Sequence, residues 1–89
     1  MDRHYIICIE GKVQGVCFRA SARDKAVELA VFGFVENKPD GSVYIEAEGS
    51  ETKLLAFMEW CHIGPDNAEV EKVKVEEEPV KGFKEFEIR

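Results

Sequence analysis

The chain has 89 residues, of which 12 are Lys or Arg and 18 are Asp or Glu, so its net charge is −6 at neutral pH. This length fits a single domain over residues 1–89, and 45% hydrophobic residues suffice for an ordinary core. No apolar run approaches the roughly 18 residues of a membrane span, and an acidic chain is poorly suited to bind nucleic acid. We therefore expect neither a membrane nor a nucleic-acid partner.

The cysteines and histidines favour a reducing compartment and no metal site. Cys8, Cys17 and Cys61 are odd in number and lack the paired spacing of zinc ligands or redox motifs. The N-terminal segment lacks the long apolar stretch of a secretion signal, so we expect a cytoplasmic protein. We also expect no disulfide, metal or cofactor. His4 and His62 are far apart in sequence, and we expect them at the surface or at the edge of the core.

The first half of the chain predicts three strands and one helix. Residues 4–10 favour a strand, and glycines at 11 and 15 mark the loop that follows. A helix to about residue 30 is predicted by apolar residues at helical spacing, which are Phe18, Ala22, Ala26 and Leu29. A strand at 32–35 and a turn at 37–41 lead to a strand over 43–48. Alternation in that last strand predicts two faces, with Val43, Ile45 and Ala47 buried and Tyr44, Glu46 and Glu48 facing solvent.

The second half predicts one more helix and two more strands. Ser50 is a good N-cap for a helix that ends near Gly64, and its core face carries Leu54, Phe57, Met58 and Cys61. Alternation at 72–76 predicts a fourth strand, and residues 86–88 predict a short fifth one at the edge. This order gives an α+β, ferredoxin-like β-α-β-β-α-β sandwich, with two helices on one face of an antiparallel sheet, plus a short C-terminal edge strand.

This topology brings two loops together. The first two strands run parallel with the third between them, so their C-terminal ends lie on one side of the sheet, roughly 10 Å apart. The loop at 11–17 and Asn37 should therefore be neighbours, and Arg19 can reach across the gap with its long side chain.

The loop itself has two interpretations. Gly11 and Gly15 permit backbone angles that turn successive N–H groups inward, and the helix that follows adds its free amides, so the loop can hold a phosphate. Arg19 would add a fork that binds two phosphate oxygens. Residues 1–30 carry five basic and four acidic side chains, which favours this third of the chain for an anion site. The other interpretation is that the glycines merely turn the chain.

The segment from Gly11 to Arg19, GKVQGVCFR, resembles the first signature of the acylphosphatase family. A second stretch, from Gly33-Phe34-Val35-Glu36-Asn37 to Gly49, resembles the second signature. The resemblance covers nearly the whole chain and implies the ferredoxin-like fold. It departs from the usual family pattern at Glu36, Phe34 and Ala30, none of which is a catalytic position.

The resemblance implies metal-independent hydrolysis of a small-molecule acyl phosphate to a carboxylate and inorganic phosphate. Arg19 matches the arginine that binds the substrate phosphate, and Asn37 matches the asparagine that orients the attacking water. The backbone amides of the phosphate cradle would be those of Gln14, Gly15, Val16, Cys17, Phe18 and Arg19. We expect the protein to act as a monomer.

Three alternatives stay open. Cys17 and Arg23 have the spacing of cysteine-dependent phosphatases, although the residues between them predict a helix instead of a phosphate loop. Cys17 near a helix N-terminus is also a candidate for oxidation. Finally, a non-catalytic ferredoxin-like module could bind a phosphorylated ligand or a protein partner with the same fold.

Overall fold

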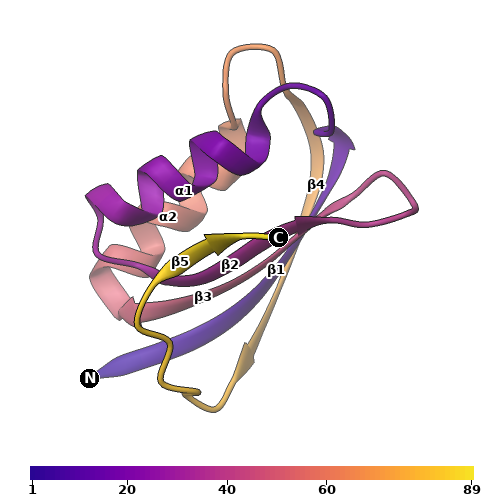
Figure 1. The fold of residues 1–89 in the computed structure, drawn as a ribbon. Helices are drawn as coiled ribbons and strands as arrows, with labels where there is room; N and C mark the ends of the chain where they lie inside the picture. Colours follow the sequence, from indigo (N-terminus) through magenta and orange to yellow (C-terminus); the bar gives the residue numbers. More distant parts are fainter.

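The computed structural model describes all 89 residues as two helices packed on one face of a five-stranded sheet (Figure 1). The elements are β1 (Asp2–Lys12), α1 (Phe18–Glu28), β2 (Phe32–Asn37), β3 (Val43–Ser50), α2 (Glu51–Ile63), β4 (Glu69–Glu78) and β5 (Phe86–Ile88). The strand order is β4-β1-β3-β2-β5, and every pairing is antiparallel except that of β2 with β5. The predicted ferredoxin-like α+β fold is confirmed, with a mixed sheet because β5 is parallel to β2.

The predicted core faces of both helices are largely confirmed, although Leu29 and Met58 are only partly buried and Leu29 lies just beyond the end of α1. Phe18, Ala22 and Ala26 are the buried residues of α1, and Leu54, Phe57 and Cys61 are those of α2. The Ser50 side chain accepts a hydrogen bond from the Lys53 N–H at 3.4 Å, as expected of an N-cap. The element bounds differ modestly from the predicted ones: α1 ends at Glu28 instead of about residue 30, and β4 covers Glu69–Glu78 instead of only 72–76. No helix is both long and apolar enough to cross a membrane.

The connection between β4 and β5, residues 79–85, crosses the helix-free side of the sheet, because these two strands are its opposite edges. We call this segment the strap. The Phe83 ring lies over His4, with ring centroids 5.6 Å apart, and meets Phe34 at 6.0 Å. The strap therefore covers part of a face that the strand pattern alone leaves in solvent.

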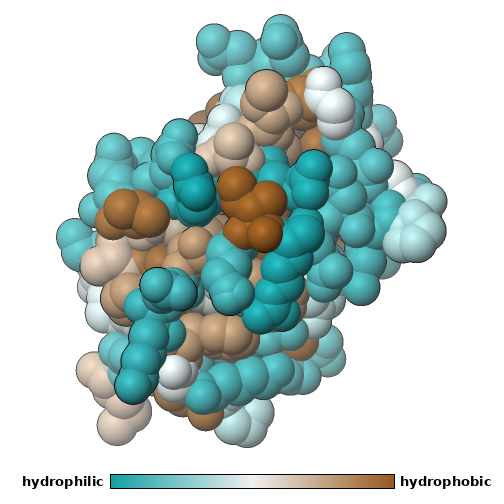
Figure 2. Space-filling view, in the orientation of Figure 1, coloured by the Kyte–Doolittle hydropathy of each residue, from teal (hydrophilic) through white to brown (hydrophobic).

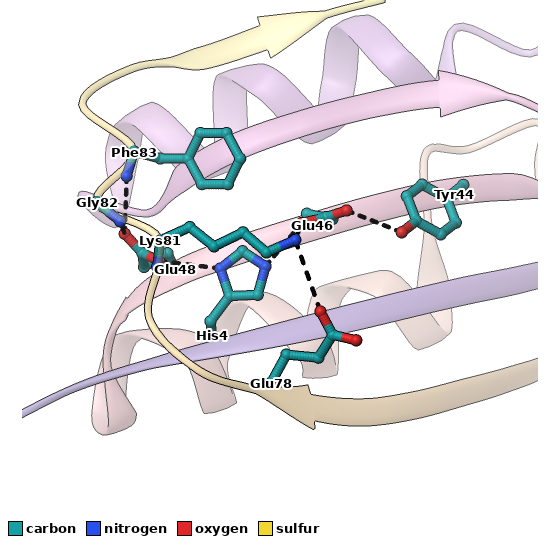
Figure 3. Close-up of polar contacts among 8 residues, drawn as sticks. All are labelled: His4, Tyr44, Glu46, Glu48, Glu78, Lys81, Gly82 and Phe83. Carbon is teal, nitrogen blue, oxygen red and sulfur yellow. Dashed lines mark hydrogen bonds and ion pairs between the residues drawn. The ribbon is translucent and has the colours of Figure 1, made fainter.

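The burial of three polar residues corrects the sequence-based expectation. Glu46 and Glu48 were expected to face solvent and His4 to lie at the surface or core edge, yet their exposed fractions are 7%, 3% and 0%. The reason is the strap, which covers this end of the sheet. Figure 3 shows His4 between the two carboxylates, with Nε2 2.8 Å from Glu46 Oε1 and Nδ1 2.9 Å from Glu48 Oε1.

The two carboxylates also hold the strap. Glu48 accepts hydrogen bonds from the backbone N–H groups of Lys81, Gly82 and Phe83, at 2.6, 2.9 and 2.8 Å. Glu46 accepts from the Lys81 ammonium at 2.9 Å and from the Tyr44 hydroxyl at 2.8 Å. Burial raises the pKa of Glu48, but the hydrogen bonds outweigh that effect and hold the pKa below its ordinary value. Burial opposes a lowered pKa at Glu46 too, and its bonds prevail in the same way.

Candidate active site

A cavity of about 390 Å³ lies at the N-terminal end of α1. It draws on four parts of the chain: the loop after β1, the first turn of α1, the last residue of β2 and the last residue of β5. Its lining residues are Val13, Gly15, Cys17, Phe18, Arg19, Ala20, Asn37 and Ile88. The topology thus brings together Arg19 and Asn37, as the sequence predicts from the shared side of the two parallel strands.

The loop from residue 13 to 17 has the backbone shape of an anion-binding cradle. Gly15 and Cys17 both have positive φ angles, 73° and 63°, and Cys17 occupies the N-cap position of α1 without a capping side chain. No backbone or side-chain acceptor of the protein takes a hydrogen bond from the amides of residues 14 to 20. These free N–H groups and the positive end of the α1 dipole favour a bound anion.

Within the predicted cradle, the side chains differ in environment. Val16 is 8% exposed and Phe18 only 2%, so both side chains anchor the loop to the core while their amides remain free. Cys17 is exposed at the rim. Residues 18 to 22 are helical, so Cys17 and Arg23 do not enclose a phosphate loop of the cysteine-dependent type.

Arg19 lies in the first turn of α1, and its guanidinium Nη1 donates a hydrogen bond to the backbone carbonyl of Arg89 at 3.0 Å. This contact spans 70 residues of sequence and draws the guanidinium toward the end of β5. Because only one nitrogen is engaged there, the remaining N–H donors of the fork are free for an anion in the cavity.

The Gln14 side chain has a structural role that the sequence does not predict. Its side-chain Nε2 donates to the carbonyls of Lys38 and Ser42, at 2.8 and 3.0 Å. The β2–β3 turn, which begins just after Asn37, is thereby attached to the cradle. Sequence reasoning used only the backbone of Gln14, since no local pattern indicates which distant carbonyls an amide side chain will meet.

Three lining residues, Val13, Ala20 and Ile88, were not predicted as part of the site, and Ile88 is the most distant of them in sequence. It was assigned only to a short edge strand, and its place at the cavity follows from the parallel pairing of β5 with β2, which sets Ile88 opposite Val35. His62 is exposed, as expected, with Nδ1 2.9 Å from the Met58 carbonyl in its own helix. No three His, Cys, Asp or Glu side chains converge as metal ligands do.

Comparison with known proteins connects this arrangement to a family. A model of the acylphosphatase family matches residues 5–88. The chain belongs to the acylphosphatase family. An acylphosphatase of Acaryochloris marina is 49% identical over 87 residues, which cover 93% of this chain and 94% of that protein. Another, from Marinobacter nauticus, is 51% identical over 73 residues, 82% of this chain and 79% of that protein.

The fold of this chain also matches a solved acylphosphatase structure. The structure of an acylphosphatase from Coxiella burnetii matches with a TM-score of 0.96 at 38% identity, covering 99% of this chain and 93% of that one. The resemblance inferred from the two sequence signatures is thus confirmed over nearly the full length.

Proposed function

We propose that the protein hydrolyses small-molecule acyl phosphates to a carboxylate and inorganic phosphate, without a metal ion. Family membership and the shared name of its relatives support this activity. One observation carries the assignment of roles: Arg19 and Asn37 line the same cavity, at the mouth of a loop whose amides have no acceptor in the protein. In this proposal the amides of residues 14 to 19 and Arg19 bind the phosphoryl oxygens, and Asn37 holds the attacking water.

The chemistry requires few groups. The leaving group is a carboxylate, whose conjugate acid has a pKa of about 4, so it departs at neutral pH without a general acid. What the protein must supply is position and positive charge. The Arg19 fork and the cradle amides stabilise charge on the equatorial oxygens, while the Asn37 amide orients water in line with the departing oxygen.

Three finer features stay within this proposal. We expect the protein to act as a monomer, because the two side chains given roles in the reaction, Arg19 and Asn37, already line one cavity within a single chain. No nucleic acid or membrane takes part. A cytoplasmic location is a prediction that the three free cysteines support.

The activity is tested by following phosphate release from benzoyl phosphate and acetyl phosphate in the presence of a chelator. We expect turnover that is unaffected by the chelator. Phosphate binding with no turnover would instead support the non-catalytic module, and turnover that disappears with the chelator would refute the metal-free mechanism.

The two side chains are separated by their effects on binding and turnover. Asn37→Ala should lower kcat about 100-fold or more and leave inhibition by inorganic phosphate nearly unchanged, because it removes only the group that orients water. Arg19→Ala should abolish both turnover and phosphate inhibition. Steady-state kinetics with benzoyl phosphate measures these effects, and circular dichroism checks that both variants fold. Unchanged hydrolysis by Asn37→Ala would contradict the role given to the amide.

A further inference from the structure

A second, larger hollow adjoins the candidate active site. It is an open groove of about 1010 Å³ between α1 and β5, and Ile88 lines both the groove and the phosphate cavity. Along α1 the lining continues from Arg19 in the cavity to Arg23 and Val27 in the groove, at intervals of four residues. Figure 2 shows apolar atoms exposed over this side of the molecule, bordered by hydrophilic ones.

The groove lies where the leaving group must go. Asn37 ends β2, whereas the groove is lined by residues that precede or begin that strand, Ala30, Val31 and Phe32. The groove therefore extends from Ile88 away from Asn37. In an in-line displacement the leaving group departs on the side opposite the water. With the water at Asn37, the acyl group points along the groove, a geometry that rests on the proposed function.

The groove offers its occupant apolar walls and one well-placed cation. Val27, Phe86 and Ile88 contribute apolar surface. Arg23 lies about 6 Å along the helix axis from Arg19 and on the same face. Its nearest acidic neighbour is Asp24, 4.0 Å away, at the limit of an ion pair. Its guanidinium is thus available to a ligand.

Two cations line the groove: Arg23 lies on the same helix as Arg19, one turn further along, whereas Lys84 belongs to the strap. Asp24 lines the groove as well. The lining also contains two further carboxylates, Glu85 and Glu87. The Glu87 carboxylate pairs with the Arg89 guanidinium, with Oε2 and Nη2 3.6 Å apart. Its side chain points away from the core because it alternates with Phe86 and Ile88 along β5.

We propose that this groove binds the acyl part of the substrate and that Arg23 selects acyl phosphates carrying a second anionic group, a carboxylate or phosphate, a few bonds beyond the acyl carbon. Ile88 contacts the acyl carbons between the two anions. Arg19 and Arg23 then bind the two ends of one dianionic substrate along a single face of α1.

The proposal is tested with succinyl phosphate, which carries a terminal carboxylate, and acetyl phosphate, which does not. The quantity measured is the kcat/KM for succinyl phosphate divided by the kcat/KM for acetyl phosphate. Arg23→Gln should lower this ratio about fivefold, a size expected for one charge interaction near the surface. Arg23→Lys should retain most of the ratio, and 0.5 M salt should reduce it in the unsubstituted protein, since exposed charges are screened.

Lys25→Gln is the matched control. It removes one positive charge from the same helix, but Lys25 pairs with Glu28 at 2.8 Å and lies outside the groove lining. A ratio that is unchanged in Arg23→Gln, or that falls equally in Lys25→Gln, would overturn the assignment of Arg23. Absence of acetyl phosphate hydrolysis by the unsubstituted protein would instead overturn the proposed function, on which this inference rests.

Discussion

Gly11 lies near the end of β1 and Gly15 within the cradle loop that follows, and the two glycines are required for different reasons. Gly11 has φ +131° at the point where the pairing of β1 with β4 shifts register, and a Cβ there would overlap the Glu69 carbonyl oxygen of β4. Gly15 has φ +73°, a region that other residues enter at moderate cost, and a Cβ there would meet nothing within 4 Å. Gly11 is thus fixed by packing between strands, and Gly15 by the curve of the cradle.

This difference gives a prediction on stability. Gly11→Ala should lower the free energy of unfolding by more than about 2 kcal/mol, because it adds a clash with backbone to an unfavourable φ. Gly15→Ala should cost only about 1 kcal/mol, the price of a left-handed conformation. Urea denaturation followed by circular dichroism measures both. Equal losses would show that the edge of the sheet relaxes around the added methyl group.

At the scale of elements, the strap is the segment whose stability should depend most on pH. It is attached to the sheet by three N–H bonds to Glu48, by Lys81 on Glu46 and by the Phe83 ring on His4 (Figure 3). The hydrogen bonds favour the ionised form of both glutamates. The pKa values of Glu46 and Glu48 are lower in the folded state than in the unfolded state. As the pH falls, the unfolded state therefore binds protons first and is favoured.

The expected result is a loss of stability in acid. The free energy of unfolding should be steady above pH 5 and fall as pH drops through about 4.5 and below, where the unfolded carboxylates become protonated. Glu48→Gln should lower it by about 1–3 kcal/mol at pH 7, because one amide oxygen cannot replace the carboxylate at four donors. The variant should also show a shallower dependence on pH.

Glu59→Gln is the control for this experiment, since Glu59 is exposed on α2 and makes no hydrogen bond or ion pair. Urea midpoints at a series of pH values from 3 to 7 give the comparison. If Glu48→Gln followed the same pH curve as the unsubstituted protein, the buried carboxylate would not be the group that senses acid.

The strap also shows where sequence reasoning stops. Alternation along β3 identified correctly which side chains share a face, and it placed Glu46 and Glu48 together with Tyr44. It could not tell that this face is covered, because the covering residues come more than 30 positions later and form no regular element. The shared location of Arg19 and Asn37 was predictable, since Arg19 lies in the first turn of α1 and Asn37 ends β2. The side-chain bonds of Gln14 depend on tertiary structure and were not.

At the scale of the whole molecule, the edges of the sheet decide whether copies associate. β4 is a ten-residue edge strand, long enough to pair with a second chain, but most of its residues are exposed and seven of the ten are charged. The opposite edge, β5, has only three residues. Charged or very short edge strands resist pairing with another sheet.

The protein should therefore remain monomeric. Light scattering coupled to gel filtration should give a mass near 10.1 kDa, independent of protein concentration. Replacing Glu71 and Lys74 with Thr leaves the net charge unchanged and makes the β4 edge more suitable for pairing, so this double variant should associate as concentration rises. A dimer in the unsubstituted protein would contradict the argument from the edges.

The span of sequence in the phosphate cavity has a consequence for how activity appears during folding. Ile88 lines the cavity together with residues of the β1–α1 loop and the first turn of α1, and β5 follows the strap that crosses the sheet. A chain that has formed β1, α1 and the β2–β3 hairpin but has not yet seated its last strand lacks one wall and the carbonyl that holds Arg19. Recovery of turnover after dilution from denaturant should therefore require that β5 is seated, whereas recovery of the helical signal should not.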